Sequence, residues 1–186
     1  MDAAPHDINA AFHSGEPQAV GAAYDAYVSS VYAFIYYRTH HRETAEDLTG
    51  DVFRKAVEHA RSYDPAKASL KTWLLRIARN TVIDHVRAHR SVVSIDDVQT
   101  IPSGIDVERV AEARRTLEEV RKHLDALPER QREVVMMRVW DGLSYAEIAT
   151  ILGKREGACK TTFCRAMKQL RILVPLPAFI ALLLAS

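Results

Sequence analysis

The chain has 186 residues, of which 48% are hydrophobic and 26% charged, and its formal net charge is +1. This length can bury one medium-sized core or two small ones, and the balanced composition excludes a disordered or fibrous protein. With only 7 glycines and 7 prolines a turn-rich β protein is also excluded, so we expect a soluble, helix-rich chain.

Three helices are predicted in the first half of the chain. Apolar residues recur every three or four positions from 20 to 38, and a second helix begins near Glu43. Asp64 and Pro65 interrupt this pattern, and Ser69 is placed to cap a third helix that runs to about Arg90. The residues predicted to be buried on the third helix are Trp73, Leu74, Ile77, Ala78 and Val86.

An extended linker is predicted after the third helix. Periodicity fails between 91 and 105, where Pro102, Ser103 and Gly104 cluster. The acidic residues of this region are Asp96, Asp97, Asp106 and Glu108. Basic residues gather on both sides of this linker. The small net charge is therefore the sum of two basic patches and an acidic connector.

Helical periodicity returns after Asp106, and Pro128 is predicted at the first position of a helix that ends at Asp141 and Gly142. Two further helices follow, because 144 to 147 has the sequence of a capping box and Gly153 is a stop signal. The last helix is predicted from about 156 to 173.

The pattern from 145 to 170 is typical of a helix-turn-helix, whose second helix enters the major groove of DNA. Ala149, Gly153 and Cys159 fit the close approach, the turn and the core of this motif. The residues predicted on the exposed face are Arg155, Glu156, Lys160, Thr161 and Arg165, and those predicted to pack inward are Ile148, Leu152, Cys159, Phe163 and Met167. The alternative is a solvated basic helix in a bundle.

A second candidate DNA-binding surface lies on the third predicted helix. Its stripe consists of Thr72, Arg76, Arg79, Asn80, Ile83 and Arg87. Such a mixture suits phosphate neutralisation together with polar contacts to bases. Asn80 could instead cap or cross-link helices.

The sequence predicts no enzyme, metal site or cofactor, because the histidines are scattered and no glycine-rich phosphate loop or Ser-His-Asp arrangement occurs. Cys159 and Cys164 match no CxxC spacing and are expected to be reduced structural thiols. Met1 is followed by polar residues rather than a signal peptide, so we expect a cytoplasmic protein.

Two sets of motifs resemble extracytoplasmic-function (ECF) sigma factors of the sigma-70 family. The first resembles sigma domain 2 and consists of Ala45-Glu46-Asp47-Leu48, Val52-Phe53, Trp73 to Asn80, Ile83-Asp84 and Arg87. The second resembles sigma domain 4 and consists of Leu127 to Val134, Gly142 to Ala149 and Leu152-Gly153. Finding both sets in this order is very specific.

The resemblance implies an all-α fold of two small helical domains joined by an extended linker. We divide the chain into an N-terminal tail (1–17), sigma domain 2 (18–91), an acidic linker (92–112), sigma domain 4 (113–173) and an apolar C-terminal tail (174–186). The implied function is to bind core RNA polymerase and to direct initiation by recognising and melting promoter DNA.

The resemblance also implies the roles of individual residues. The implied polymerase contacts are Asp47, Asp51 and Arg54. The implied contacts with the minus-10 element are Tyr63, Lys71, Arg76, Arg79, Asn80 and Arg87, with 63 to 71 as the specificity loop and Trp73 mostly in the core. The implied contacts with the minus-35 element are Ser144, Arg155, Glu156, Lys160, Thr161 and Arg165.

Some positions differ from the family pattern. Gly50 lies where the family usually has Gln, and Arg155 lies where a capping Ser is common. Lys154 replaces an apolar residue, and Ala158-Cys159 replaces a Thr-Val pair. The promoter preference of relatives therefore does not transfer to this chain.

The partners implied are core RNA polymerase, promoter DNA and an anti-sigma factor, and the free chain is expected to be a monomer. The acidic residues of the linker either mimic the charge of nascent RNA or only keep the linker soluble. The tail from 174 to 185 is almost wholly apolar but too short for a membrane span. We expect it to pack on either domain or on a partner, with a weak membrane-surface anchor as the alternative.

Two other functions stay open from the sequence. An autonomous helix-turn-helix regulator would need a dimer, and no coiled-coil heptad is visible. A purely structural adaptor would leave both basic surfaces unexplained.

Overall fold

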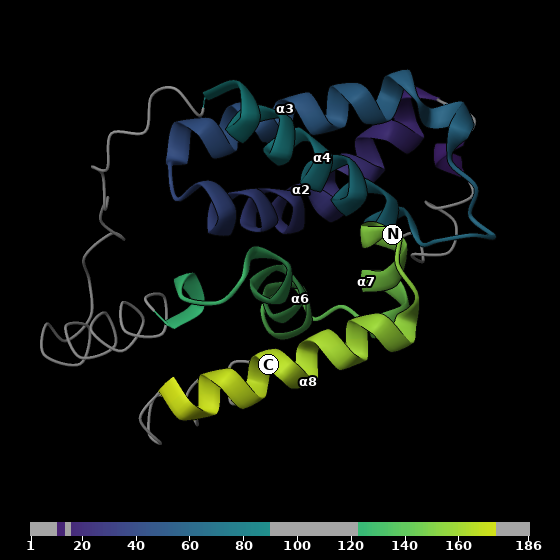
Figure 1. Ribbon diagram of the computed structural model, residues 1–186. Coiled ribbons are helices and arrows are strands. Elements are labelled where there is room, and N and C mark those ends of the chain that lie inside the picture. The colour runs from purple at the N-terminus through teal and green to yellow at the C-terminus, as the bar shows by residue number, and fades with distance from the viewer. Residues whose placement is uncertain (1–10, 14–15, 90–122, 174–186) are drawn as a thin grey trace, which may run out of the picture. The chain divides into compact units, whose positions relative to one another are not determined.

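The computed structural model describes residues 11–13, 16–89 and 123–173 (Figure 1). Within these ranges the regular elements are helices, with no strand, as the predicted all-α fold requires. The chain divides into two compact units, Met1–Gln99 and Thr100–Ser186. The acidic linker and the apolar tail predicted at 92–112 and 174–186 lie outside the described residues.

Between residues 16 and 89, unit 1 forms three long helices and a short one. They are α2 (Pro17–Thr39), α3 (Arg42–Glu58), the 3-10 helix η1 (Ala60–Ser62) and α4 (Leu70–His89). Helices α2, α3 and α4 each pack against the other two (Figure 1). Their shared core includes Phe34, Val52 and Leu74, all fully buried, so the amphipathic stripes predicted for these helices face one another.

Local chemistry sets the helix boundaries in unit 1. His40 ends α2 in the left-handed conformation with φ 53°, and His41 caps α3 by accepting a hydrogen bond from the Thr44 amide at 3.2 Å. The predicted Ser69 cap is confirmed, because its hydroxyl oxygen accepts a hydrogen bond from the Thr72 amide at 3.2 Å.

Burial along α4 differs from the prediction at its two ends. Val86 was predicted to be buried but is 46% exposed, because no residue of α4 after Val82 is buried. Thr72 was predicted on the exposed stripe but is 1% exposed, and its hydroxyl group is hydrogen-bonded to that of Ser69 at 2.9 Å.

Unit 2 is built on α6 (Glu129–Val139), α7 (Tyr145–Leu152) and α8 (Glu156–Leu173). Part of its core consists of Leu124, Leu127, Val135, Val139, Ala166 and Leu170, against which Trp140, Phe163 and Met167 pack. Pro128 is the N-cap of α6 rather than its first residue, and α6 ends at Val139, before the predicted Asp141.

Helices α7 and α8 have the predicted helix-turn-helix connection. The Glu147 amide donates to the Ser144 hydroxyl at 3.2 Å and the Ser144 amide donates to the Glu147 carboxylate at 2.8 Å, which confirms the capping box. Gly153 ends α7 with φ 62°, a conformation that favours glycine. Cys159 is 2% exposed and lies in the core of the motif, as predicted.

None of the described helices is long and apolar enough to span a membrane. Among the same residues, no group of three or more His, Cys, Asp or Glu side chains is placed to hold a metal ion.

Candidate polymerase and nucleic-acid interfaces

The polar stripe of α4 contains the residues predicted to contact the minus-10 element. Arg76, Asn80 and Arg87 are exposed and Arg79 is partly exposed. Arg76 lies three and four residues before Arg79 and Asn80, and Arg87 lies seven residues after Asn80, which places them on one side of the helix. The side chain of Asn80 has no hydrogen-bond partner among the described residues, so its carboxamide is available to an incoming polar group and does not cross-link helices here.

The loop between η1 and α4 corresponds to the predicted specificity loop. Asp64 accepts a hydrogen bond from the Ala66 amide at 3.0 Å and pairs with Lys67 at 2.9 Å. The Lys67 hydrogen bond, followed by that of the Ala66 amide, lowers the pKa of Asp64 below its ordinary value. The loop therefore begins with an ionised carboxylate, and hydrogen bonds between its own residues hold it. Lys71, in the first turn of α4, is partly exposed.

Tyr63 requires a correction to the predicted set of DNA contacts. Its side chain is 1% exposed and its hydroxyl donates to the Ala68 carbonyl at 3.1 Å. Burial raises the pKa of this phenol. Tyr63 therefore stabilises the loop through its hydrogen bond to Ala68, and its buried ring is inaccessible to a base.

The exposed side of α3 holds the residues predicted to contact polymerase. Asp47 is exposed, and Arg54 pairs with Asp51 at 3.2 Å and with Glu58 at 2.8 Å. The hydrogen bonds that the Arg54 guanidinium donates to Asp51 and Glu58 raise its pKa. Solvent screens exposed pairs of this kind, so they contribute little to stability and a partner can displace them at small cost.

Gly50 lies beside this charged face. A Cβ atom added to it would meet nothing within 4 Å, so the missing side chain is not required by packing. The glycine lies at one side of an open groove of about 400 Å³ between α2 and α3, lined by Tyr24, Val28, Ser29, Tyr32, Glu46, Thr49 and Gly50.

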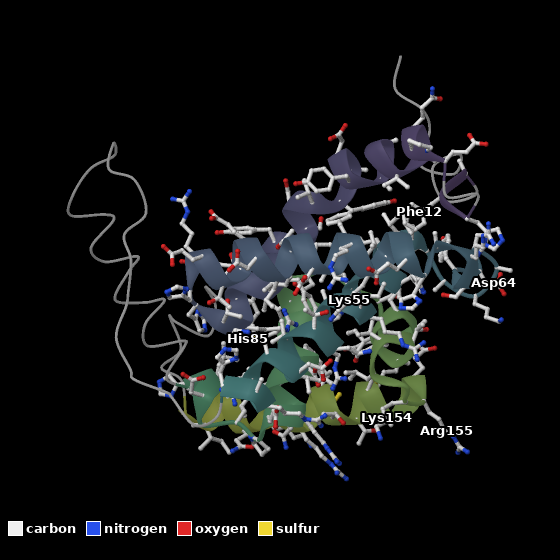
Figure 2. All side chains as sticks on the ribbon, turned by 90° about the horizontal axis from the view of Figure 1, so that it is seen from above. Phe12, Lys55, Asp64, His85, Lys154 and Arg155 are labelled. Carbon is white, nitrogen blue, oxygen red and sulfur yellow. The ribbon has the colours of Figure 1, made fainter. Side chains whose placement is uncertain are left out.

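Five of the predicted minus-35 contacts lie on the exposed side of α8 or directly before it. Arg155, Glu156, Lys160, Thr161 and Arg165 are all exposed. Glu156 pairs with Lys160 at 2.8 Å, and the Thr161 hydroxyl donates to the Gly157 carbonyl at 2.9 Å. Arg155 directly precedes the helix, and it projects outward with Lys154 at the turn (Figure 2).

Ser144 lies at the N-terminus of α7 and was also predicted to contact DNA. Its hydroxyl donates to the Glu147 carboxylate at 2.7 Å in addition to the capping contacts described above. The hydroxyl is thus engaged within the motif, and capping is the role that the structure shows for Ser144.

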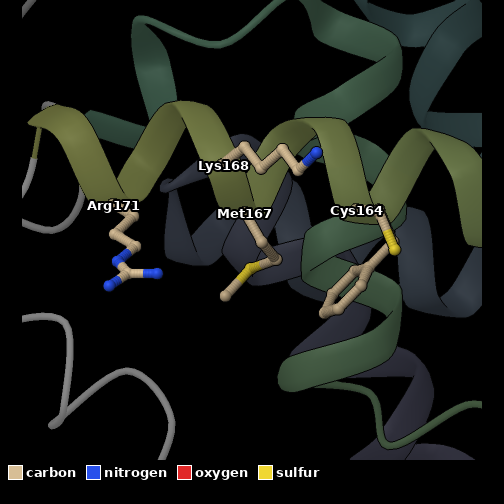
Figure 3. A pocket seen from close by; sticks show the side chains of 5 residues that line it. Cys164, Met167, Lys168 and Arg171 are labelled. Atoms are coloured by element: carbon tan, nitrogen blue, oxygen red, sulfur yellow. The ribbon is translucent and has the colours of Figure 1, made fainter.

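A shallow apolar groove runs along another side of α8 (Figure 3). Its volume is about 360 Å³ and its lining residues are Phe163, Cys164, Met167, Lys168 and Arg171. Phe163 and Met167, predicted to face inward, are only partly buried because they form this groove. Cys164 is exposed and Cys159 is buried, and both are free thiols.

Sequence reasoning missed Phe12 and His13, which fall in the segment predicted as an N-terminal tail. Phe12 is 1% exposed, and the His13 ring is hydrogen-bonded through Nδ1 to the Tyr63 carbonyl at 2.8 Å. The only signal in the sequence was one aromatic residue among mostly polar neighbours. Helical periodicity does not detect a single buried residue of this kind.

Comparisons with known proteins identify both units. The sequence matches the family models of Sigma-70 region 2 over residues 23–92 and of Sigma-70, region 4 over residues 117–170. The ECF RNA polymerase sigma factor SigM of Bacillus subtilis is 33% identical over 160 residues, which cover 81% of this chain and 91% of SigM. The chain belongs to the ECF sigma factors.

Two further similarities agree with this membership. The ECF sigma factor BldN of Streptomyces coelicolor is 36% identical over 170 residues, covering 87% of this chain but only 62% of BldN. The sigma factor RpoE of Bartonella quintana, solved with the anti-sigma factor NepR, is 26% identical with a TM-score of 0.63, covering 82% of this chain and 94% of that one. Sigma factors are transcription initiation factors that bind core RNA polymerase and promoter DNA, so this ECF sigma factor is not an enzyme.

Proposed function

We propose that this sigma factor divides its task among three surfaces. The acidic side of α3, with Asp47, Asp51 and Arg54, binds core RNA polymerase. The stripe of α4 and the loop before it open and hold the minus-10 element, while α8 binds the minus-35 element as duplex. The observation that carries the proposal is that each helix presents exposed or partly exposed polar residues on one side, while its opposite side forms the core of its unit.

The polymerase surface is supported by its charge and its openness. Asp47 is exposed, and Arg54 holds Asp51 in a weak surface network that a binding partner can rearrange. Asp47→Ala is expected to weaken binding to purified core polymerase about fivefold or more, as measured with a fluorescently labelled chain. The control is Asp25→Ala, which removes an exposed carboxylate from α2. Equal affinities for the two variants would refute the assignment.

The minus-10 surface is supported by the combination of cations with an unengaged amide on α4. Holding an unpaired base costs unstacking energy, which polar and stacking contacts offset. Asn80→Ala is expected to slow opening of promoter DNA carrying 2-aminopurine, without changing affinity for polymerase. Gln18→Ala, which removes an exposed amide from α2, is the matched control. Normal opening by Asn80→Ala would contradict the proposal.

The minus-35 surface is supported by the exposed basic residues of α8. We expect Lys160 to leave its exposed pair with Glu156 and contact phosphate, so its removal is expected to reduce the slope of log affinity against log salt by about 1. An unchanged slope in titrations of holoenzyme with duplex promoter DNA would remove Lys160 from the interface.

Control of this activity is proposed to come from an anti-sigma factor, as the solved complex of RpoE with NepR suggests by analogy. The site of action proposed is the cytoplasm, where RNA polymerase is found, and the free chain is proposed to be a monomer. A sedimentation mass of one chain at micromolar concentration is expected, and a stable dimer would favour an autonomous DNA-binding regulator instead.

A further inference from the structure

The segment before α2 inserts an aromatic ring into the core of unit 1. Phe12 is 1% exposed and makes edge contacts with two other rings, at 6.2 Å from the centroid of Tyr63 and 6.0 Å from that of Trp73. Tyr63 and Trp73 contact each other at 5.3 Å. The aromatic cluster, defined as Phe12, Tyr63 and Trp73, thus joins three separate parts of the chain, and edge-to-face pairs of this kind prefer one geometry.

Two hydrogen bonds hold Tyr63, one through its backbone and one through its side chain. The Tyr63 carbonyl is bonded to the His13 ring at 2.8 Å, and the Tyr63 hydroxyl donates to the Ala68 carbonyl at 3.1 Å. Tyr63 is therefore held through its backbone, its ring and its hydroxyl group. The N-terminal segment supplies two of these contacts, since His13 bonds to the Tyr63 backbone and Phe12 packs against the Tyr63 ring.

The position of the cluster is what gives it functional meaning. Tyr63 begins the loop that leads into α4, and Trp73 lies in the first turns of α4. Phe12 lies at the same end of unit 1 as Asp64 of that loop, while His85 lies toward the other end of α4 (Figure 2). The N-terminal segment therefore supports the loop from the inside.

We propose that Phe12, assisted by His13, is a positioning residue that holds the 63–71 loop in the shape that captures an unpaired base of the minus-10 element. This inference rests on the proposed function of the loop. A loop that is ordered before binding avoids the entropy cost of ordering during capture, and a base pocket must be held within a fraction of an ångström to discriminate between bases. Phe12 acts through Tyr63 and Trp73 and does not itself touch DNA.

A purely structural role for Phe12 makes a different prediction. If the ring only stabilised unit 1, its loss would weaken polymerase binding and base selection together. A positioning role affects base selection while polymerase binding is retained. Phe34 provides a matched control, because it is fully buried in the same unit and its ring is covered by Arg38 rather than by the loop.

The experiment uses holoenzyme assembled from core polymerase and the full chain. Forked DNA with a randomised single-stranded minus-10 element is selected by binding and sequenced, and affinity for core is measured in parallel. Phe12→Leu, which keeps apolar volume but removes the ring, is expected to reduce base discrimination about tenfold while affinity for core changes less than about twofold. Phe34→Leu is expected to leave discrimination unchanged.

His13→Ala tests the same inference without altering the core. It removes the hydrogen bond to Tyr63 and is expected to reduce discrimination about threefold in a chain with unchanged helicity. The inference is overturned if Phe12→Leu and Phe34→Leu behave alike, or if both Phe12→Leu and His13→Ala select like the wild type. If the wild-type holoenzyme itself selects no sequence, the proposed function of the loop fails, which is a distinct result.

Discussion

Replacing Ser144 with alanine would separate the structural role of this residue from its predicted contact with DNA. The variant loses the hydroxyl that accepts from the Glu147 amide at 3.2 Å and donates to the Glu147 carboxylate at 2.7 Å, while the hydrogen bond from the Ser144 amide to that carboxylate at 2.8 Å is retained. Loss of an N-cap typically costs about 1 kcal/mol. In a unit of this size that corresponds to a fall of about 4 to 8 °C in Tm.

The assay is hydrogen exchange followed by mass spectrometry, which distinguishes α7 from the helices of unit 1. Amides of α7 are expected to exchange about five times faster in Ser144→Ala, because 1 kcal/mol changes an opening equilibrium by that factor. Thr150→Ala is the control, since it removes a hydroxyl that bonds only to the Ala146 carbonyl in the same helix. Alanine favours a helix interior, so Thr150→Ala is expected to exchange no faster.

Two results would refute this reasoning. Exchange in Ser144→Ala that matches the wild type would show that the capping box contributes nothing to α7. Weaker duplex binding at unchanged exchange would assign Ser144 to direct contact with DNA.

Three further predictions follow from exposure and charge. Gly50→Ala is expected to raise the free energy of unfolding by about 0.5 to 1 kcal/mol in urea titrations, because the site is an open helix position, and a loss of stability would contradict this. A thiol reagent is expected to modify Cys164 in the native chain and Cys159 only after unfolding, because Cys159 is 2% exposed and burial raises its pKa. Equal rates of modification of the two cysteines in the native chain would contradict this prediction. Burial and the neighbouring His89 lower the pKa of His85 below its ordinary 6.5. The stability that neutral His85 contributes is therefore complete above pH 6.5 and is lost as pH falls through the folded pKa. His85→Gln is expected to reduce this loss of stability in thermal melts between about pH 7 and 5, and an unchanged profile would contradict the prediction.

Features set by local chemistry were predictable from the sequence. The capping box at Ser144, the turn at Gly153 and the Ser69 cap each depend on residues within a few positions of one another, and the structure confirms all three. The helix-turn-helix was predictable for the same reason, since its start, turn and buried residues have fixed spacings.

Features set by distant contacts were not predictable in the same way. Periodicity identifies the side of a helix but not what covers it, so Thr72 was placed on the exposed stripe although its hydroxyl bonds to Ser69 and its side chain is buried. Tyr63 was assigned to DNA because the family resemblance implies a specificity loop at 63 to 71, whereas in the structure its ring packs against Phe12 and Trp73. No pattern in the sequence connects Phe12 with that loop.

The most direct test of the central claim is run-off transcription with purified core RNA polymerase on a pool of genomic promoter fragments. The full chain is expected to direct new, discrete transcripts. The double variant Arg79→Ala, Asn80→Ala is expected to lose these transcripts while still binding polymerase. The account would be contradicted if no transcripts appeared and the chain alone bound duplex DNA tightly, since that is the behaviour of an autonomous regulator.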